Sequence, residues 1–385
     1  MQGFIIGIDA SNIHEGGGVS HLCNLLSSLN PSVHGIKRII VWSGDKTLNL
    51  LAGRPWLEKS KLPEWGRLRP VKQLFWQYLR LPRAAREAEC DLLFAPGGSC
   101  YSTFKPIATM SRNLLPFEWP ELWRFGVSIV TLRLLLLRNI QSRSFRRAAG
   151  VVFLTKYARK RVCEVAGRLN GATIIIPHGI SSRFKVAPKE QRSISEYNST
   201  SPYNILYVSI IDQYKHQWHV VEAVALLRQR GLPLQLDLVG PSYPPALARL
   251  KKTLARFDPQ GEWVRYHGTI PYADLCQTYT QADLGVFASS CENMPNILLE
   301  TMASGLPIAC SDRGPMPEVL GEAGVFFNPE QPREIARALR ELIDSPQLRA
   351  KKAEASYLRA QRFSWERSAS DTFTFLAKLV HQHRN

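Results

Sequence analysis

Short apolar runs alternate with helical patterns along the first half of the chain. Residues 4–9 (FIIGID) have the composition of a buried strand, and a loop with three consecutive glycines follows. After that loop, leucines recur at helical spacing between residues 19 and 29. The alternation continues, with further strands predicted at residues 38–42, 91–95, 106–110, 151–154 and 172–176. Strands that alternate with helices in this way predict a parallel sheet with crossover connections.

The same pattern starts again after a polar segment. Residues 189–202 (KEQRSISEYNSTSP) hold few apolar side chains, and we interpret them as a linker. Beyond this segment, strands are predicted at residues 204–208, 234–239, 264–267, 284–288, 307–309 and 325–327. The sequence therefore predicts an α/β fold with two Rossmann-like, doubly wound domains.

The predicted domains are residues 1–188 and residues 203–364. A C-terminal helix over residues 365–385 is expected to pack back toward the first domain. Ligands of doubly wound sheets bind beyond the carboxyl ends of the strands. We therefore expect the site in a cleft between the two domains.

Positive charge is concentrated in the first half of the chain. The formal net charge is +17, and residues 1–185 contribute +16 of it while residues 186–385 contribute +1. Such asymmetry points to an anionic partner, which could be a nucleic acid, an anionic membrane surface or a phosphorylated substrate. A basic surface that is simply solvated is the alternative.

Other features of the sequence bear on the compartment. The seven cysteines are scattered and include no C-x-x-C pair, which argues against a disulfide framework or a zinc site and favours a reducing cytosol. Residues 1–10 lack the basic start of a signal peptide. Residues 127–137 are apolar but interrupted by Arg133, and they are shorter than the roughly 20 residues of a spanning helix. They could form a basic helix on a membrane or a buried helix.

The strongest chemical signal is the segment 289–300 (SSCENMPNILLE). Glu292 directly follows a predicted strand, and Glu300 lies about one turn into the next helix. The first N–H groups of that helix, at Asn296, Ile297 and Leu298, would form an anion site suited to a diphosphate. The two carboxylates would accept hydrogen bonds from ribose and sugar hydroxyls. Two glutamates on a solvated surface are the alternative interpretation.

The segment E-N-M-P-N-I-L-L-E-T-M-A-S-G-L-P-I resembles the E-x7-E region of family 4 glycosyltransferases, which have the GT-B fold and usually retain anomeric configuration. Further matches follow in the family's order. They are the glycine loop at Gly16, Gly17 and Gly18, the turn Pro177-His178-Gly179, Lys215 after a strand, the turns Val239-Gly240 and His267-Gly268, and Glu318.

The resemblance implies a set of site residues. Catalytic roles fall to Glu292, Lys215 and Arg112, and donor binding to Gly17, Gly18, Lys215, Gly240, His267, Asn296, Ile297 and Glu300. Lys215 would contact the donor diphosphate, and we expect neither Lys215 nor Glu300 to lie in a core. No metal and no cofactor are expected, because the chain has no Asp-x-Asp-type cluster beside the proposed phosphate site.

The sequence also departs from the family pattern. Arg112 stands where the family has a histidine near the transferred sugar, and Ser209-Ile210 stand where it often has Gly-Arg. Lys215 would therefore act without that arginine. Asn293, Met294 and Pro295 replace the glycines and phenylalanine that often follow the first glutamate.

The resemblance therefore implies a hexosyltransferase that uses a UDP- or GDP-sugar. Residues 1–188 would bind the acceptor and residues 203–364 the nucleotide sugar. The enzyme's acceptor would be a glycan or a lipid-diphosphate-linked oligosaccharide, in surface polysaccharide or lipopolysaccharide biosynthesis, with retention. We expect it in the cytoplasm, peripheral on the inner face of the membrane.

A sugar-nucleotide 2-epimerase of the same fold is an alternative. A nucleic-acid-binding protein is an alternative of a different class, but the chain has no recognition motif for it and we expect no nucleic-acid partner.

Overall fold

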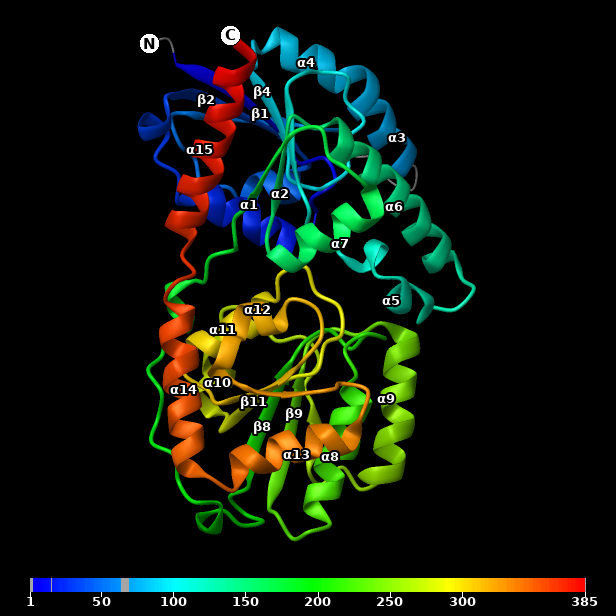
Figure 1. Ribbon diagram of the computed structural model, residues 1–385, viewed down its shortest axis with the longest axis vertical. Coiled ribbons are helices and arrows are strands. Elements are labelled where there is room, and N and C mark those ends of the chain that lie inside the picture. The colour runs from blue at the N-terminus through cyan, green and yellow to red at the C-terminus, as the bar shows by residue number, and fades with distance from the viewer. Residues whose placement is uncertain (1–2, 15, 64–68, 385) are drawn as a thin grey trace. The chain divides into compact units, whose positions relative to one another are not determined.

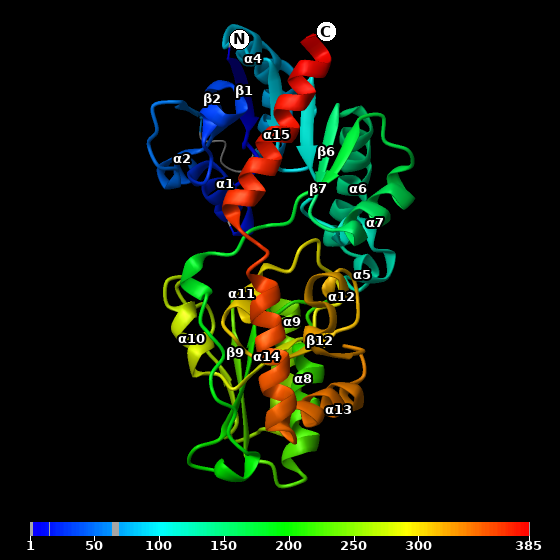
Figure 2. The same ribbon diagram turned by 60° about the vertical axis from the view of Figure 1, so that its left-hand side comes forward.

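A computed structural model describes residues 3–14, 16–63 and 69–384, without the side chains of residues 69 and 70. The chain divides into two compact units (Figures 1 and 2). Unit 1 comprises Met1–Leu122, Gly126–Gly179 and Ser364–Asn385, and unit 2 comprises Trp123–Phe125 and Ile180–Phe363. Apart from the short excursion at Trp123–Phe125, the chain passes from unit 1 to unit 2 after residue 179 and returns after residue 363.

Unit 1 is built on a seven-stranded parallel sheet with the order β3-β2-β1-β4-β5-β6-β7. Its strands are β1 (Phe4–Asp9), β2 (Ile36–Ser43), β3 (Leu57–Lys61), β4 (Leu92–Ala95), β5 (Ile107–Met110), β6 (Gly150–Phe153) and β7 (Ala172–Ile175). The edge strand β3 is absent from the sequence prediction. Its sequence LEKSK is mostly polar, as is common at a sheet edge, and only its pairing with β2 reveals it.

Helices cover both faces of this sheet (Figure 1). One face carries α1 (Gly17–Ser27), α2 (Asp45–Leu50) and the last helix, α15 (Trp365–Arg384), and α1 and α15 lie side by side in Figure 2. The other face carries α3 (Arg69–Phe75), α4 (Leu81–Glu87), α6 (Ile129–Arg147) and α7 (Lys156–Ala166), with α5 (Trp119–Trp123) nearby. A π-helical turn over Trp76–Arg80 joins α3 to α4.

Unit 2 contains a six-stranded parallel sheet with the order β10-β9-β8-β11-β12-β13. The strands are β8 (Tyr203–Val208), β9 (Leu234–Val239), β10 (Val264–Tyr266), β11 (Leu284–Phe287), β12 (Ile308–Ser311) and β13 (Val325–Phe327). The helices are α8 (Gln217–Arg228), α9 (Pro244–Phe257), α10 (Leu275–Gln281), α11 (Asn296–Ala303), α12 (Met316–Leu320), α13 (Pro332–Ile343) and α14 (Pro346–Ala360). Both sheets confirm the predicted doubly wound class.

The strand order reverses at one point in each sheet. In unit 2 the reversal lies between β8 and β11, and in unit 1 it lies between β1 and β4. Loops that leave the carboxyl ends of two such strands diverge to opposite faces of the sheet, and ligands bind in the crevice between them. This topology selects the loops after β8 and β11 as a candidate site in unit 2.

Residues 189–202 do not behave as a linker, so that interpretation was wrong. The buried guanidinium of Arg349 donates to Gln191 Oε1 at 3.1 Å, to the Arg192 carbonyl and to the Leu342 carbonyl at 2.9 Å. Asp283 accepts from Lys189 Nζ at 2.9 Å and from the Tyr197 hydroxyl at 3.1 Å. The segment is polar because its polar groups are bound to unit 2, which composition alone does not distinguish from solvation.

Across residues 3–14, 16–63 and 69–384, none of the helices combines the length and the apolar character needed to cross a bilayer.

Candidate functional site

Lys215 and Glu292 meet where the strand order of unit 2 reverses. Lys215 lies in the loop after β8 and Glu292 in the loop after β11, and Lys215 Nζ forms an ion pair with Glu292 Oε1. Their side chains are only 7% and 17% exposed. The expectation that Lys215 lies outside a core was therefore wrong. A buried ammonium group needs an anionic partner, and Glu292 supplies it.

Hydrogen bonds hold the loop after β8 to its own strand and to the loop after β11. The hydroxyl of Tyr207, a buried residue of β8, donates to the Lys215 carbonyl at 2.8 Å. The Ser290 N–H donates to the Tyr214 carbonyl at 2.8 Å, and Ser290 Oγ lies 2.9 Å from His216 Nε2. Burial lowers the pKa of His216 far below its usual value, so the imidazole is neutral at physiological pH. The two loops are thus fixed relative to each other, and these contacts also fix the position of the Lys215 backbone.

Glu300 lies one turn into α11 and is 4% exposed. The expectation that Glu300 lies outside a core was therefore wrong as well. Its carboxylate accepts hydrogen bonds from the hydroxyls of Tyr272 at 3.1 Å and Tyr279 at 3.3 Å. Burial raises the pKa of Glu300 to about 7, against the opposing effect of the two tyrosine hydrogen bonds. No motif points to these tyrosines, because their contact with Glu300 arises only from the packing of α10 and its preceding loop on α11.

The start of α11 offers fewer donors than predicted. The Asn296 N–H donates to the Met294 carbonyl at 3.0 Å, so its assignment as a donor for an anion was wrong. The N–H groups of Ile297 and Leu298 make no hydrogen bond with any described residue. The side-chain oxygen of Asn296 is buried and likewise lacks a partner among the described residues. These groups remain available to a ligand at the helix terminus.

Two further strand ends border this region. The Gly240 N–H, after β9, donates to the Gly268 carbonyl at 2.7 Å, and the φ of Gly240 is +142°. A side chain at Gly240 would overlap the Ser209 carbonyl oxygen, so only glycine lets β8 and β9 approach so closely here. His267, after β10, pairs through Nε2 with Asp237 Oδ1 at 2.7 Å. This contact occupies one of its two ring nitrogens.

Ser209 is a candidate that the sequence reasoning treated only as a departure from the family pattern. It follows β8 directly and is buried, and its hydroxyl has no hydrogen-bond partner among the described residues. A buried hydroxyl without a partner is costly, and a ligand oxygen would satisfy it.

The remaining predicted residues lie in unit 1. Gly17 and Gly18 open α1 after β1, and a side chain at Gly18 would lie 3.2 Å from Arg112 Nη1. Arg112 makes no ion pair with the described residues, and burial lowers its pKa to about 10, so it is charged at neutral pH. A cation thus stands beside a helix N-terminus, which is an arrangement suited to an anion.

Two histidines support Arg112 from inside unit 1. His21 Nδ1 lies 2.8 Å from His178 Nδ1, and Trp365 packs against both rings. Burial, with the nearby Arg112, lowers the pKa of His178 to about 3 and that of His21 well below its usual value. Both rings are therefore neutral, and the only positive charge of this group is that of Arg112.

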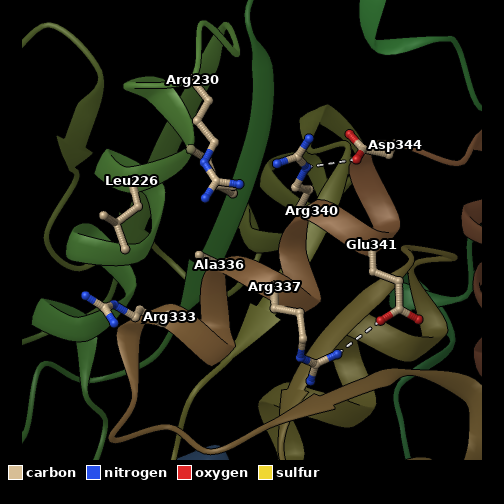
Figure 3. Close-up of a pocket in the computed structure, with 9 residues that line it drawn as sticks. Leu226, Arg230, Arg333, Ala336, Arg337, Arg340, Glu341 and Asp344 are labelled. Atoms are coloured by element: carbon tan, nitrogen blue, oxygen red, sulfur yellow. Dashed lines mark hydrogen bonds and ion pairs between the residues drawn. The ribbon is translucent and has the colours of Figure 1, made fainter.

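Among residues 3–14, 16–63 and 69–384, no three His, Cys, Asp or Glu side chains are placed to hold a metal ion. A pocket of about 810 Å³ lies between α8 and α13 and contains none of the predicted site residues (Figure 3). Four arginines line it, of which Arg337 pairs with Glu341 and Arg340 with Asp344. Arg230 and Arg333 lack acidic partners among the described residues.

Known proteins resemble this chain in sequence and in fold. Residues 202–345 match the family described as Glycosyl transferases group 1. The O-antigen chain mannosyltransferase B of Escherichia coli is 31% identical over 110 residues, which is 29% of each chain. The chain spans between 29% and 58% of the length of this relative and seven other curated relatives, which is less than two thirds in each case.

Solved structures cover nearly the whole chain. Sucrose-phosphate synthase from Thermosynechococcus elongatus has a TM-score of 0.78 and 18% identity, covering 98% of this chain and all of that one. Anabaena Alr3699/HepE, solved with UDP and glucose, has a TM-score of 0.70 and 18% identity, covering 97% of this chain and all of that one. The resemblance to family 4 glycosyltransferases is thus confirmed: the chain has the GT-B fold and carries the glycosyl transferases group 1 region in residues 202–345.

Proposed function

We propose that this protein is a glycosyltransferase that moves a hexosyl group from a UDP- or GDP-sugar to a glycan or lipid-diphosphate-linked acceptor. The observation that carries the proposal is the buried Lys215–Glu292 ion pair between β8 and β11, with Glu300 on the adjoining α11. All three residues lie within the matched segment 202–345.

The chemistry of the leaving group explains this arrangement. A nucleotide sugar loses a nucleoside diphosphate, whose negative charge grows in the transition state. Lys215 supplies a fixed positive charge, and the N–H groups of Ile297 and Leu298 supply hydrogen-bond donors. In unit 1, the start of α1 and Arg112 form a separate candidate anion site. In unit 2, Lys215 and the start of α11 would stabilise the diphosphate without a metal, and we infer that transfer needs none.

Specificity for a nucleotide would come from Glu300 and its surroundings. An ionised carboxylate only accepts hydrogen bonds, and ribose hydroxyls are suitable donors. HepE was solved with UDP bound, which supports a nucleotide-sugar donor here. The E. coli relative acts on O-antigen chains, which supports an acceptor in surface polysaccharide or lipopolysaccharide biosynthesis. We further propose retention of configuration and a cytoplasmic protein that is peripheral on the inner face of the membrane.

A panel of UDP- and GDP-sugars tests the proposal. At about 100 times its Kd, the true donor should raise stability by roughly 2.7 kcal/mol, read as an increase in melting temperature. That donor is then incubated with a labelled acceptor extract, and transfer of the sugar is expected. Conversion of the donor without any acceptor would indicate a 2-epimerase instead. If no sugar nucleotide raises the melting temperature, the proposed function is wrong.

A further inference from the structure

Unit 1 exposes two apolar helical faces that the proposed reaction does not use. The first, here called the α6 face, consists of Val127, Ile129, Leu132 and Leu136, which are 60–101% exposed. The three α6 residues recur at positions i, i+3 and i+7, so they form one stripe of the helix. Trp119 continues this surface, with the guanidinium of Arg138 lying 4.1 Å above its ring.

The second surface, here called the α3 face, follows α3 and the π-helical turn. It consists of Val71, Leu74, Phe75, Tyr78 and Leu79, each 44–67% exposed. These positions form a continuous helical stripe with the spacing i, i+3, i+4, i+7 and i+8. In the view of Figure 1, α3 and α6 both lie on the flank of unit 1 away from α15.

Neither face is needed to hold its helix in place. Leu134 and Phe145 on the inner side of α6 are buried. Trp76 Nε1 and Gln77 Nε2, on the inner side of the π-helical turn, donate to the Asp9 carboxylate at 3.4 and 2.6 Å. The outward apolar side chains therefore contribute little to the fold. An apolar stripe of this size in solvent marks a surface that something covers.

The charge around both faces indicates what covers them. The helix Ile129–Arg147 contains five arginines and no acidic residue, and residues 69–86 contain five basic residues and no acidic one. Arg133, Arg143, Arg146 and Arg147 are exposed and form no ion pair with the described residues. A second copy docking through the same face would bring arginines against arginines. A surface with anionic phosphates above an apolar layer complements both features.

We propose that the α6 face and the α3 face together form a docking surface for an anionic lipid bilayer. The apolar side chains enter the boundary between headgroups and acyl chains, while the arginines bind lipid phosphates. The inference extends the proposed function, since it gives the protein direct access to a lipid-linked acceptor. The docking surface consists only of exposed residues of unit 1, whereas the proposed function depends on Lys215, Glu292 and Glu300 in unit 2.

The test measures binding of the full chain to vesicles of phosphatidylcholine with or without phosphatidylglycerol, by co-sedimentation. An α6 variant carries Val127→Ser, Ile129→Gln, Leu132→Gln and Leu136→Gln, where glutamine preserves helix propensity. An α3 variant carries Val71→Gln, Leu74→Gln, Phe75→Gln and Leu79→Gln. A charge variant carries Arg133→Ala, Arg143→Ala, Arg146→Ala and Arg147→Ala. The control, Arg230→Ala/Arg333→Ala, removes positive charge from the pocket of Figure 3 in unit 2.

The parent should bind the anionic vesicles and bind neutral ones weakly. The α6 variant should lose affinity by at least about 100-fold, and the α3 variant by at least about tenfold, because apolar area no longer enters the bilayer. The charge variant should lose about 1000-fold at low salt. The control should bind like the parent.

The proposal is overturned if the α6, α3 and charge variants all bind anionic vesicles as tightly as the parent does. It is also overturned if the control loses as much vesicle affinity as these variants do. The oligomeric state of the parent and of the α6 variant is compared as well. If the parent is dimeric, the α6 variant is monomeric and both bind vesicles equally, a second copy covers the α6 face instead. Stabilisation by the nucleotide sugar is measured on the same variants and should be unchanged. A protein that binds vesicles but no nucleotide sugar would contradict the proposed function alone.

Discussion

Replacing Glu300 with glutamine should have opposite effects on stability and on nucleotide binding. Burial raises the pKa of Glu300 from 4.5 to about 7, so the native state holds its proton more tightly than the unfolded chain does. Each pKa unit corresponds to about 1.4 kcal/mol, so the ionised carboxylate costs the fold about 3 kcal/mol. This cost is absent below pH 4.5 and complete above about pH 7.

The sign of the pH dependence follows directly. The stability of the parent should fall relative to that of Glu300→Gln as the pH rises from about 4.5 to about 8, by about 3 kcal/mol in total. Glutamine can still accept a hydrogen bond from Tyr272 or Tyr279, so the variant should fold. Nucleotide affinity should fall at about pH 8 by roughly 1.5–3 kcal/mol, because a charge-assisted hydrogen bond to ribose is weakened.

Urea denaturation at both pH values and isothermal titration with the nucleoside diphosphate measure the two effects. Glu354→Gln, on the exposed side of α14 in the same unit, makes the same chemical change and should alter neither. Unchanged nucleotide affinity in Glu300→Gln would show that the pocket does not lie at α11. A variant that loses stability relative to the parent as the pH rises would refute the reasoning from burial.

Three further predictions concern the same unit. Lys215→Ala should lower kcat by roughly 100- to 1000-fold, because it removes positive charge where the leaving diphosphate develops its own. A kcat of Lys215→Ala within about tenfold of that of the parent would contradict this role of Lys215. Lys215→Ala also leaves the Glu292 carboxylate unpaired, so the double variant Lys215→Ala/Glu292→Gln should recover the stability that the single variant loses. Activity should survive EDTA, and a loss restored by Mn²⁺ or Mg²⁺ would reject metal-independent transfer. Arg349→Leu should cost about 3–5 kcal/mol in urea denaturation, because Gln191 and three carbonyl groups lose a buried cationic donor. An unchanged urea midpoint would show that the segment 189–202 is held by other contacts.

The apolar pattern alone predicted most of both sheets. Strands buried on both faces, such as β1 and β4, are nearly continuous apolar runs with turn residues after them, so they can be predicted locally. The edge strand β3 could not be read in this way, because its polar side chains face solvent and only its backbone pairing defines it. The polar segment 189–202 misled for the complementary reason, since its partners Asp283 and Arg349 lie 80 or more residues away in the chain.

The sequence by itself also determined which residues to consider at the site, because the segment from Glu292 to Glu300, and Lys215 after its strand, resemble family 4 glycosyltransferases. Only the tertiary structure decided what each of them contacts. The ion pair between Lys215 and Glu292 exists because β8 lies beside β11, and strand order is a property of the whole sheet. The raised pKa of Glu300 and the unpartnered hydroxyl of Ser209 likewise depend on burial, which is set by elements distant in the chain. Local periodicity specifies which face of an element is apolar, whereas the choice of neighbours on that face is made by the packing of the entire unit.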